Sequence, residues 1–301
     1  MRRYNIPTAE YRNFRHYDEA KDYLSTVNHR VVIKVSGLAA GKGVVLPESQ
    51  GEAHKELREI MVDKKFGDVG EEVVIEEFLS GDEISILTFV DGHDFKSLPP
   101  GQDHKRIFDG SRGPNTGGMG VYGPTDFVSR ELMWQIDRDI LAPTIQGLES
   151  DGHPFRGMLF TGIMVMPTGP EVLNINLADV CLSCIKGTLG DQDLRVQDGY
   201  ACNAVVASAG HPGEYRQGHR VEITPCPADT NIFHAGTILR DGHFETAGGR
   251  VVSVSAVRRT LPEAVEAAYE GVRCIDFPGM QYRRDIASRL GSVQIDPDDS
   301  H

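Results

Sequence analysis

The sequence predicts an α+β fold, and three features of its apolar and glycine pattern indicate it. Short β-rich runs alternate with helical patterns up to about residue 195. After Asp198-Gly199 the chain changes to short apolar strands separated by glycine turns, which is typical of a small antiparallel β unit. A strong helix then runs from Thr260 to Ile275, and Glu263 three residues after Thr260 predicts a capping box. We therefore expect α/β lobes followed by a small, mixed, β-rich domain.

The first predicted elements are two strands with a helix between them. Residues 30–35 and 72–77 are β-rich runs, and each delivers the chain into a polar loop. The apolar residues from Ala53 to Met61 keep helical spacing, and Gly67 stops that pattern. This order places two loops, one after each strand, where ligand-binding residues are often found.

The middle of the chain predicts a third strand, a long helix and a hairpin. Residues 84–90 form an apolar run that an Asp91-Gly92 turn closes. A helix from Ser129 to about Leu148 is expected to be disturbed at Pro143, since proline lacks the N–H that a helix needs. Residues 159–166 and 171–176 are predicted to pair through a Pro/Gly turn.

Composition limits the class of protein. The 301 residues, 40% of them apolar and 25% charged, can bury one or two cores, which excludes a disordered or fibrous chain. With 31 Lys+Arg against 44 Asp+Glu, the net charge of −13 disfavours nucleic acid and anionic membranes as partners. No apolar run approaches the ~18 residues of a membrane span, and five scattered cysteines form no disulfide framework. A cytoplasmic protein is expected.

The glycine-rich segment from Gly37 to Gly43 is a candidate phosphate site. It follows a strand that carries Lys34, its small residues let backbone N–H groups approach an anion, and Lys42 adds charge. It is not a Walker A loop, because three residues rather than four precede the Gly-Lys pair and Gly43 stands where a hydroxyl would bind Mg²⁺. A flexible glycine turn with a solvated lysine is the alternative.

The acidic segment after the second strand is a candidate nucleoside site. Glu76, Glu77, Phe78 and Leu79 leave an apolar strand, so their backbone can bind the edge of an adenine ring. Glu83 follows and can accept hydrogen bonds from both ribose hydroxyls. An exposed acidic run is the alternative.

Together these segments resemble the nucleotide site of the ATP-grasp superfamily, and further motifs make the resemblance more specific. The chain resembles phosphoribosylamine–glycine ligase, the glycinamide ribonucleotide synthetase family, through motifs that occur in family order. They are IPTAEY (6–11), GLAAGKGV (37–44), VIEEFLSGDE (74–83), QDHKR (102–106), GPNTGGMG (113–120), FHAGT (233–237) and GGRV (248–251). The pair QDHKR and GPNTGGMG is the most specific feature.

The resemblance implies a fold and a set of domains. An ATP-grasp domain is expected over residues 1–195, with a small lobe to about 70 and a large lobe from 71, followed by a C-terminal domain over 196–292 and a tail over 293–301. Relative to the family, Met1 aligns after an N-terminal Rossmann-like domain. The sequence leaves open whether the chain was cut from a longer, multifunctional purine-synthesis polypeptide.

The resemblance also assigns residues to the ligands. ATP is expected to bind Lys34, Gly37, Gly41, Lys42, Gly43, Glu76, Glu77, Phe78, Leu79 and Glu83. The catalytic residues are expected to be Lys34, Lys42, Lys105 and Arg106. The acceptor site is expected to include Asp103, His104, Asn115, Thr116, Gly117, Gly118 and Met119. For Lys105 and Arg106, a solvated basic turn is the alternative.

The expected metal, Mg²⁺ or Mn²⁺, meets a departure from the family pattern. The family strand carries a Glu and, two residues on, an Asn as metal ligands, and here Asn174 replaces that Glu while Asn176 remains. The family segment RFGDPETQ that follows is absent. Because Mg²⁺ prefers anionic oxygens, an amide in place of a carboxylate weakens the site. Cys181 and Cys184 lack the two further ligands of a zinc site.

The function implied by the resemblance is ATP-dependent ligation of glycine to 5-phosphoribosylamine through glycyl phosphate, in purine biosynthesis. Two alternatives stay open. One is a catalytically impaired nucleotide-binding fragment or scaffold of the same family, which Asn174 and the absent segments favour. The other is a different ATP-grasp carboxylate–amine ligase, which QDHKR and GPNTGGMG disfavour.

Overall fold

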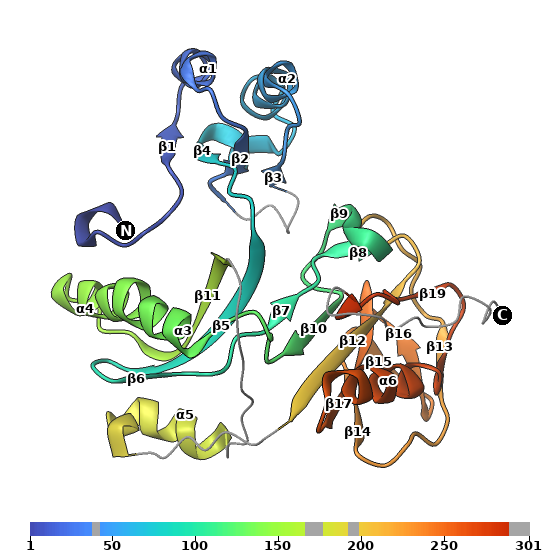
Figure 1. Cartoon of the computed structure of the whole chain (residues 1–301). Helices are drawn as coiled ribbons and strands as arrows, with labels where there is room; N and C mark the ends of the chain where they lie inside the picture. The colour runs from blue at the N-terminus through green and yellow to red at the C-terminus, as the bar shows by residue number, and fades with distance from the viewer. Residues whose placement is uncertain (38–42, 166–176, 192–198, 289–301) are drawn as a thin grey trace. The chain divides into compact units, whose positions relative to one another are not determined.

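The computed structural model describes residues 1–37, 43–165, 177–191 and 199–288, and Figure 1 labels its helices and strands. The chain forms two compact units, one from Met1 to Gly81 and one from Asp82 onward. The lobe and domain boundaries expected near residues 70 and 195 stay predictions, and the second lies outside the described residues.

The first unit is an antiparallel sheet with two helices packed on one face (Figure 1). Its strand order is β1 (Tyr11–Phe14), β4 (Val73–Glu77), β2 (Val31–Val35) and β3 (Val44–Val45). Helices α1 (Tyr17–Thr26) and α2 (Gln50–Met61) bury Leu24 and Leu57 against Ile33 and Ile75. Alternate residues of a strand share a face, so Lys34 and Glu76 lie on the face opposite the helices. The predicted strands and helix of this region are confirmed.

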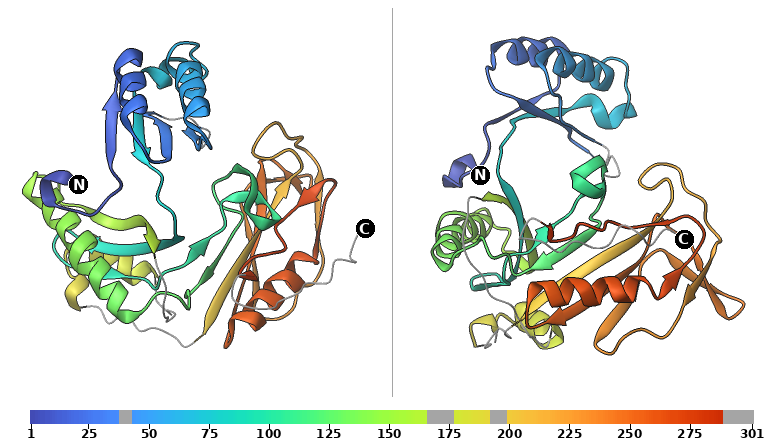
Figure 2. Two further views of the ribbon diagram at one scale, coloured as in Figure 1. Left: turned by 45° about the horizontal axis from the view of Figure 1, so that its top comes forward. Right: turned by 45° about the vertical axis from the view of Figure 1, so that its right-hand side comes forward.

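The second unit begins with a three-stranded antiparallel sheet. Its order is β11 (Arg156–Val165), β5 (Asp82–Asp91) and β6 (Phe95–Ser97). Helices α3 (Arg130–Ile136) and α4 (Ala142–Ser150) lie along one face, where Ile84 and Ile86 form the core (Figure 2). On the other face, α5 (Leu177–Lys186) packs Cys184 against Phe89 near one end of the sheet.

The long helix expected from Ser129 to Leu148 is interrupted earlier than predicted. A π-helical turn occupies Asp137–Leu141, between α3 and α4, whereas the disturbance was expected at Pro143 itself. Proline removes one hydrogen bond to the preceding turn and crowds the carbonyl four residues before it, so the irregularity falls N-terminal to the ring. The predicted start is confirmed, because the Ser129 hydroxyl accepts from the backbone N–H of Leu132 at 3.0 Å.

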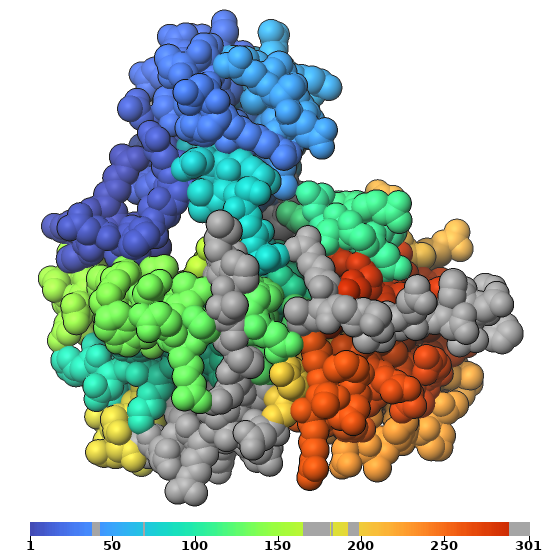
Figure 3. All heavy atoms as spheres, viewed as in Figure 1, coloured from blue at the N-terminus to red at the C-terminus, as the bar shows by residue number. Residues whose placement is uncertain are grey.

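A larger antiparallel sheet completes the second unit and includes strands from the middle of the chain. Its order is β14 (Thr230–His234), β17 (Arg250–Arg258), β12 (Tyr200–Ser208), β10 (Gly120–Gly123) and β7 (Gln102–Asp103), and β19 (Met280–Gln281) also pairs with β12. Helix α6 (Leu261–Val272) packs its apolar side on this sheet, and its outer side forms the orange-red surface in Figure 3. The sheet thus joins both predicted acceptor motifs to the C-terminal segment.

The remaining strands of the second unit are short. One sheet has the order β15 (Thr237–Arg240), β16 (His243–Thr246), β13 (Arg220–Ile223) and β18 (Ile275–Asp276), and β8 (Arg106–Phe108) pairs with β9 (Arg112–Asn115). The predicted capping box of Thr260 and Glu263 is confirmed. The end of that helix was predicted too late, because Ile275 pairs with Ile223 in a strand instead. Among the described residues, no helix is both long and apolar enough to cross a membrane.

Candidate functional site

In the first unit, Lys34 and the acidic linker are in direct contact. Lys34 and Glu76 lie diagonally across β2 and β4, and the Lys34 Nζ is 2.5 Å from a carboxylate oxygen of Glu76. The Arg30 guanidinium stacks 4.3 Å from the ring centre of Phe78, whose N–H donates to the Arg30 carbonyl. The linker is therefore fixed beside the strand that carries Lys34, although the ATP roles of these residues stay predictions.

The glycine-rich loop joins β2 to β3. Lys34 pairs with Val44, and the Val35 N–H donates to the Gly43 carbonyl at 2.9 Å, so Gly43 ends the loop next to the strand that begins it. A cavity of about 660 Å³ near the start of the loop is lined by Ser36 and Gly37, among others. Gly41 and Lys42 lie outside the described residues.

In the second unit, the predicted ribose carboxylate contacts a predicted catalytic lysine. Glu83, at the start of β5, forms an ion pair with the Lys105 ammonium, and the two side chains are partly exposed, at 41% and 32% respectively. The backbone carbonyl of Lys105 accepts hydrogen bonds from both the N–H and the hydroxyl of Thr116, at 2.7 and 2.9 Å. The QDHKR and GPNTGGMG motifs are thus held together at Lys105.

Asp103 lies beside the glycines of the second motif. An ideal Cβ placed on Gly118 would be 2.9 Å from a carboxylate oxygen of Asp103, and φ at Gly118 is +106°, so only glycine suits this position. Burial raises the pKa of Asp103; Glu83 adds to the shift, while Lys105 and Arg250 oppose it. A carboxylate kept in a place that disfavours its charge is a frequent property of functional sites.

The other acceptor residues are held by backbone contacts. The His104 carbonyl accepts from the Met119 N–H at 2.8 Å, and Met119 is buried. Arg106 pairs with Asn115 across β8 and β9, and its guanidinium donates to the Gly113 carbonyl at 2.5 Å. The structure therefore brings the predicted acceptor residues into one cluster.

Two arginines of this cluster were not predicted as site residues. Arg250 donates to the carbonyls of Gly117 and Gly118 at 2.7 and 3.3 Å. Arg283, whose side chain is 2% exposed, forms a two-bond ion pair with Asp285 and donates to the Arg106 carbonyl at 3.3 Å. The GGRV motif marked Arg250, but the 283–286 segment lacks a pattern that predicts its contact with residues 106–110.

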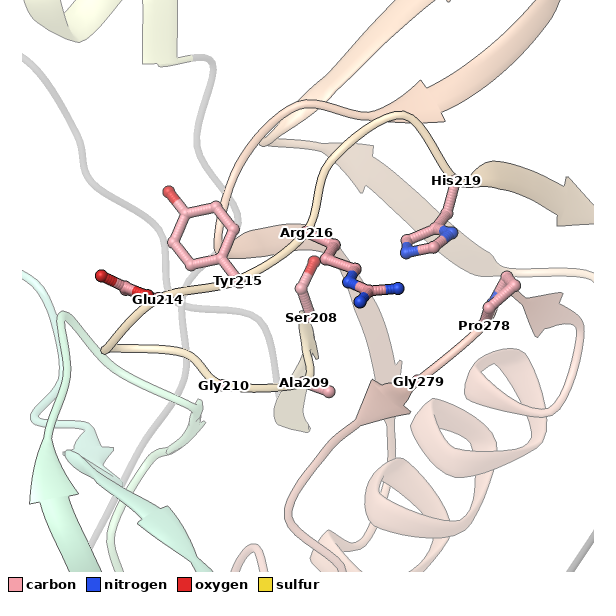
Figure 4. Close-up of a pocket in the computed structure, with 9 residues that line it drawn as sticks. All are labelled: Ser208, Ala209, Gly210, Glu214, Tyr215, Arg216, His219, Pro278 and Gly279. Carbon is pink, nitrogen blue, oxygen red and sulfur yellow. The ribbon is translucent and has the colours of Figure 1, made fainter.

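A separate cavity of about 640 Å³ lies in the second unit between the 208–219 loop and Gly279. Figure 4 shows Arg216 and His219 side by side, with Glu214 and Tyr215 pointing the other way. Elsewhere in this loop, His211 packs so closely on Gly249 that a Cβ there would be 2.2 Å from the ring. The loop thus supports the backbone next to Arg250, while none of the predicted site residues lines the cavity.

The metal residues expected from the sequence, Asn174 and Asn176, lie outside the described residues. Among the residues that are described, no group of three or more His, Cys, Asp or Glu side chains converges as a metal site would. The metal assignment therefore stays a prediction.

The fold is that of ATP-grasp enzymes, followed by a C-terminal domain. The chain belongs to the phosphoribosylglycinamide synthetase family, because residues 1–180 match its ATP-grasp (A) domain and residues 201–289 match its C domain. The predicted α+β fold and the predicted family are confirmed.

Individual relatives agree with this assignment. The chain is 40% identical to phosphoribosylamine–glycine ligase of Chlorobaculum tepidum, over 96% of this chain and 73% of that protein. The crystal structure of phosphoribosylamine–glycine ligase from Thermotoga maritima superposes with a TM-score of 0.81 at 31% identity, covering 95% of this chain and 76% of that one. A bifunctional purine biosynthetic protein of Schizosaccharomyces pombe is 45% identical over 95% of this chain, which spans only 39% of that protein's length.

Asp103→Asn is expected to stabilise the folded protein at neutral pH by about 1 kcal/mol, the usual scale of a stabilising substitution. The raised pKa of Asp103 means that its contribution to stability is present below the unfolded pKa and is lost as pH rises through the folded pKa. Urea unfolding of both proteins at pH 7 and near pH 3 measures this. An equal difference at the two pH values would contradict the assignment.

Proposed function

We propose that this protein joins glycine to 5-phosphoribosylamine with ATP, giving glycinamide ribonucleotide. The observation that carries the proposal is the acceptor cluster, in which Asp103, Lys105 and Thr116 from two family-specific motifs meet. The printed names of the relatives above support the same activity.

The reaction needs an activated carboxylate. Glycine attacks the γ-phosphorus of ATP through a carboxylate oxygen, ADP leaves, and the amine of phosphoribosylamine then displaces phosphate from the acyl carbon. We assign Lys34 and Lys42 to the ATP phosphates, where positive charge stabilises the transferring phosphoryl group. We assign Glu76–Leu79 to adenine and Glu83 to ribose. Lys105 and Arg106, beside Asp103, are assigned to the acceptor end.

The residues expected to hold the metal depart from the family pattern. Mg²⁺ supplies charge neutralisation to ATP-grasp chemistry in general, and one fold neighbour, a biotin carboxylase domain 11% identical to this chain, was solved with MgADP. Here the sequence offers two neutral amides, Asn174 and Asn176, which do not fit a hard cation well. No step is therefore assigned to the metal. This observation favours, as a second candidate, an impaired chain that still binds nucleotide.

Lys34→Ala tests the nucleotide assignment. A lost charge-assisted contact costs about 1.5–3 kcal/mol, so ATP affinity measured by calorimetry is expected to fall by about ten- to a hundredfold. Lys55→Ala is the matched control, because Lys55 lies in the same unit on α2 and is 73% exposed. Unchanged affinity in Lys34→Ala, or a preference for another base, would refute the assignment.

Asn174→Glu tests the metal assignment. A carboxylate at residue 174 is expected to restore Mg²⁺-dependent ATP affinity by about tenfold or more, since Mg²⁺ binds anionic oxygens more strongly than amides. Calorimetry with and without Mg²⁺ measures this.

The isolated chain is expected to release phosphate slowly with glycine and phosphoribosylamine, and turnover in the ~1–10³ s⁻¹ range of ordinary enzymes would exclude the impaired alternative.

A further inference from the structure

The ion pair of Glu83 and Lys105 joins two residues that the proposed function assigns to different substrates. Glu83 is assigned to the ribose of ATP, and Lys105 to the acceptor end. In the structure the Glu83 carboxylate and the Lys105 ammonium form an ion pair with each other. Two ribose hydroxyls bound across the carboxylate would use both of its oxygens, and the Lys105 ammonium already occupies one of them, Oε1. The ribose and Lys105 therefore compete for the same oxygen.

The surroundings of Glu83 suit a sugar. Glu83 pairs with Met164 across β5 and β11, and Ser85 pairs with Gly162 on the same face. Gly162 leaves space, since an ideal Cβ there would be 3.9 Å from Glu83 Oε1. Phe160, on this face of β11, is 57% exposed. The carboxylate thus borders an open apolar surface, which is the combination that binds the C–H and O–H groups of a ribose.

A second carboxylate is ready to receive the lysine. Both Lys105 and Glu83 act electrostatically on Asp103, so the three charges lie close together, with Arg250 as the fourth charged group. The backbone of Lys105 is fixed by Thr116, so only its side chain has to move. Asp103 lies against Gly118 in the acceptor loop, residues 106–120.

We propose that Glu83 exchanges partners, holding Lys105 when no nucleotide is bound and the ribose when one is, and that Lys105 then passes to Asp103. This inference rests on the proposed function, which places ribose at Glu83. The pair is partly exposed, so water screens it and its opening costs little. Ribose hydroxyls donate charge-assisted hydrogen bonds to a carboxylate, so they can replace the ammonium as its partner. Nucleotide binding thereby moves Lys105 to the acceptor loop, which favours nucleotide before acceptor.

The test uses adenosine, which has the ribose but no phosphates whose charge would mask the effect. Adenosine and 2′,3′-dideoxyadenosine are each titrated into the isotope-labelled chain, and binding is followed by NMR. Lys105→Met is expected to tighten adenosine binding about two- to fivefold, because the competing partner is gone, and to leave the dideoxy compound unchanged. Glu83→Gln is expected to weaken adenosine about tenfold, towards the dideoxy value. Lys96→Met, on β6 of the same sheet, removes the same charge elsewhere and is expected to have no effect.

Weaker or unchanged adenosine binding in Lys105→Met, in a chain whose wild type binds ATP, would overturn the exchange and leave the proposed function standing. A wild type that binds neither ATP nor adenosine would instead refute the proposed function and this inference together. Carbon NMR of the Asp103 carboxylate gives a second readout. Its titration midpoint is expected to fall when adenosine is added to the wild type, and adenosine is expected to leave the midpoint unchanged in Lys105→Met. A midpoint that stays in wild type would refute the transfer of Lys105 to Asp103.

Discussion

Arg283→Met is expected to destabilise the second unit by about 3–5 kcal/mol, the cost of breaking a buried ion pair by removing one partner. The Arg283 guanidinium donates to both oxygens of Asp285, at 2.7 and 2.6 Å, and its side chain is 2% exposed. Without it, Asp285 keeps its charge in a partly buried place with only the Gly110 N–H as a described donor. Urea unfolding followed by circular dichroism measures the loss.

The loss of stability in Arg283→Met is also expected to affect the acceptor loop. Residues 283–286 contact it at three points: Arg283 with the Arg106 carbonyl, Asp285 with the Gly110 N–H, and the Arg284 N–H with Asp109. Hydrogen exchange of residues 106–120 should therefore accelerate in Arg283→Met. Arg284→Met is the matched control, because that neighbouring side chain is exposed. Equal stabilities of the two variants would contradict the role assigned to Arg283.

Asp285 gives this contact a pH dependence. Burial alone would raise its pKa, but the hydrogen bonds from Arg283 and Gly110 outweigh burial and hold the pKa below its ordinary value. A lowered pKa contributes stability above the unfolded value, and that stability is lost as pH falls through the folded pKa. The difference between wild type and Asp285→Asn is therefore expected to shrink in acid.

The parts of the fold that follow from local pattern were predicted from the sequence. The apolar period places β2, β4 and α2, and the Thr260 capping box places the start of α6, because propensity and capping act within a few residues. The pairing of β10 with β12 was not predicted. Val121 and Asn203 face each other there across a long stretch of sequence, and no local signal encodes such a partner.

The candidate site likewise contains residues that the sequence predicts and residues that it does not predict. Lys105 and Asp103 were predicted as site residues because their motif is dense in charge, and motif resemblance supplied the roles proposed for them. Arg283 was missed, since a single arginine near the end of a domain carries no periodicity. Only the folded chain shows that it reaches the carbonyl of Arg106, 177 residues away. The ion pair of Glu83 with Lys105 is equally a product of tertiary structure.

Gly236→Ala is expected to be the other strongly destabilising change, by about 3 kcal/mol, at the upper end of what overpacking costs. An ideal Cβ on Gly236 would be 2.5 Å from the Arg250 carbonyl oxygen and 2.7 Å from the Gly248 Cα, so backbone on both sides blocks it. The FHAGT and GGRV motifs therefore need glycine because their backbones touch. Relieving the clash moves the start of β17, and Arg250 with it.

The effect of Gly236→Ala on the site follows from that shift. Arg250 would no longer align with the carbonyls of Gly117 and Gly118, so hydrogen exchange of the acceptor loop should accelerate along with the loss of stability. Gly51→Ala is the control with the opposite sign. Gly51 lies in α2 with nothing within 4 Å of its ideal Cβ, so alanine should stabilise the helix by about 0.5 kcal/mol. A Gly236→Ala variant as stable as wild type would show that the two motifs do not touch as described.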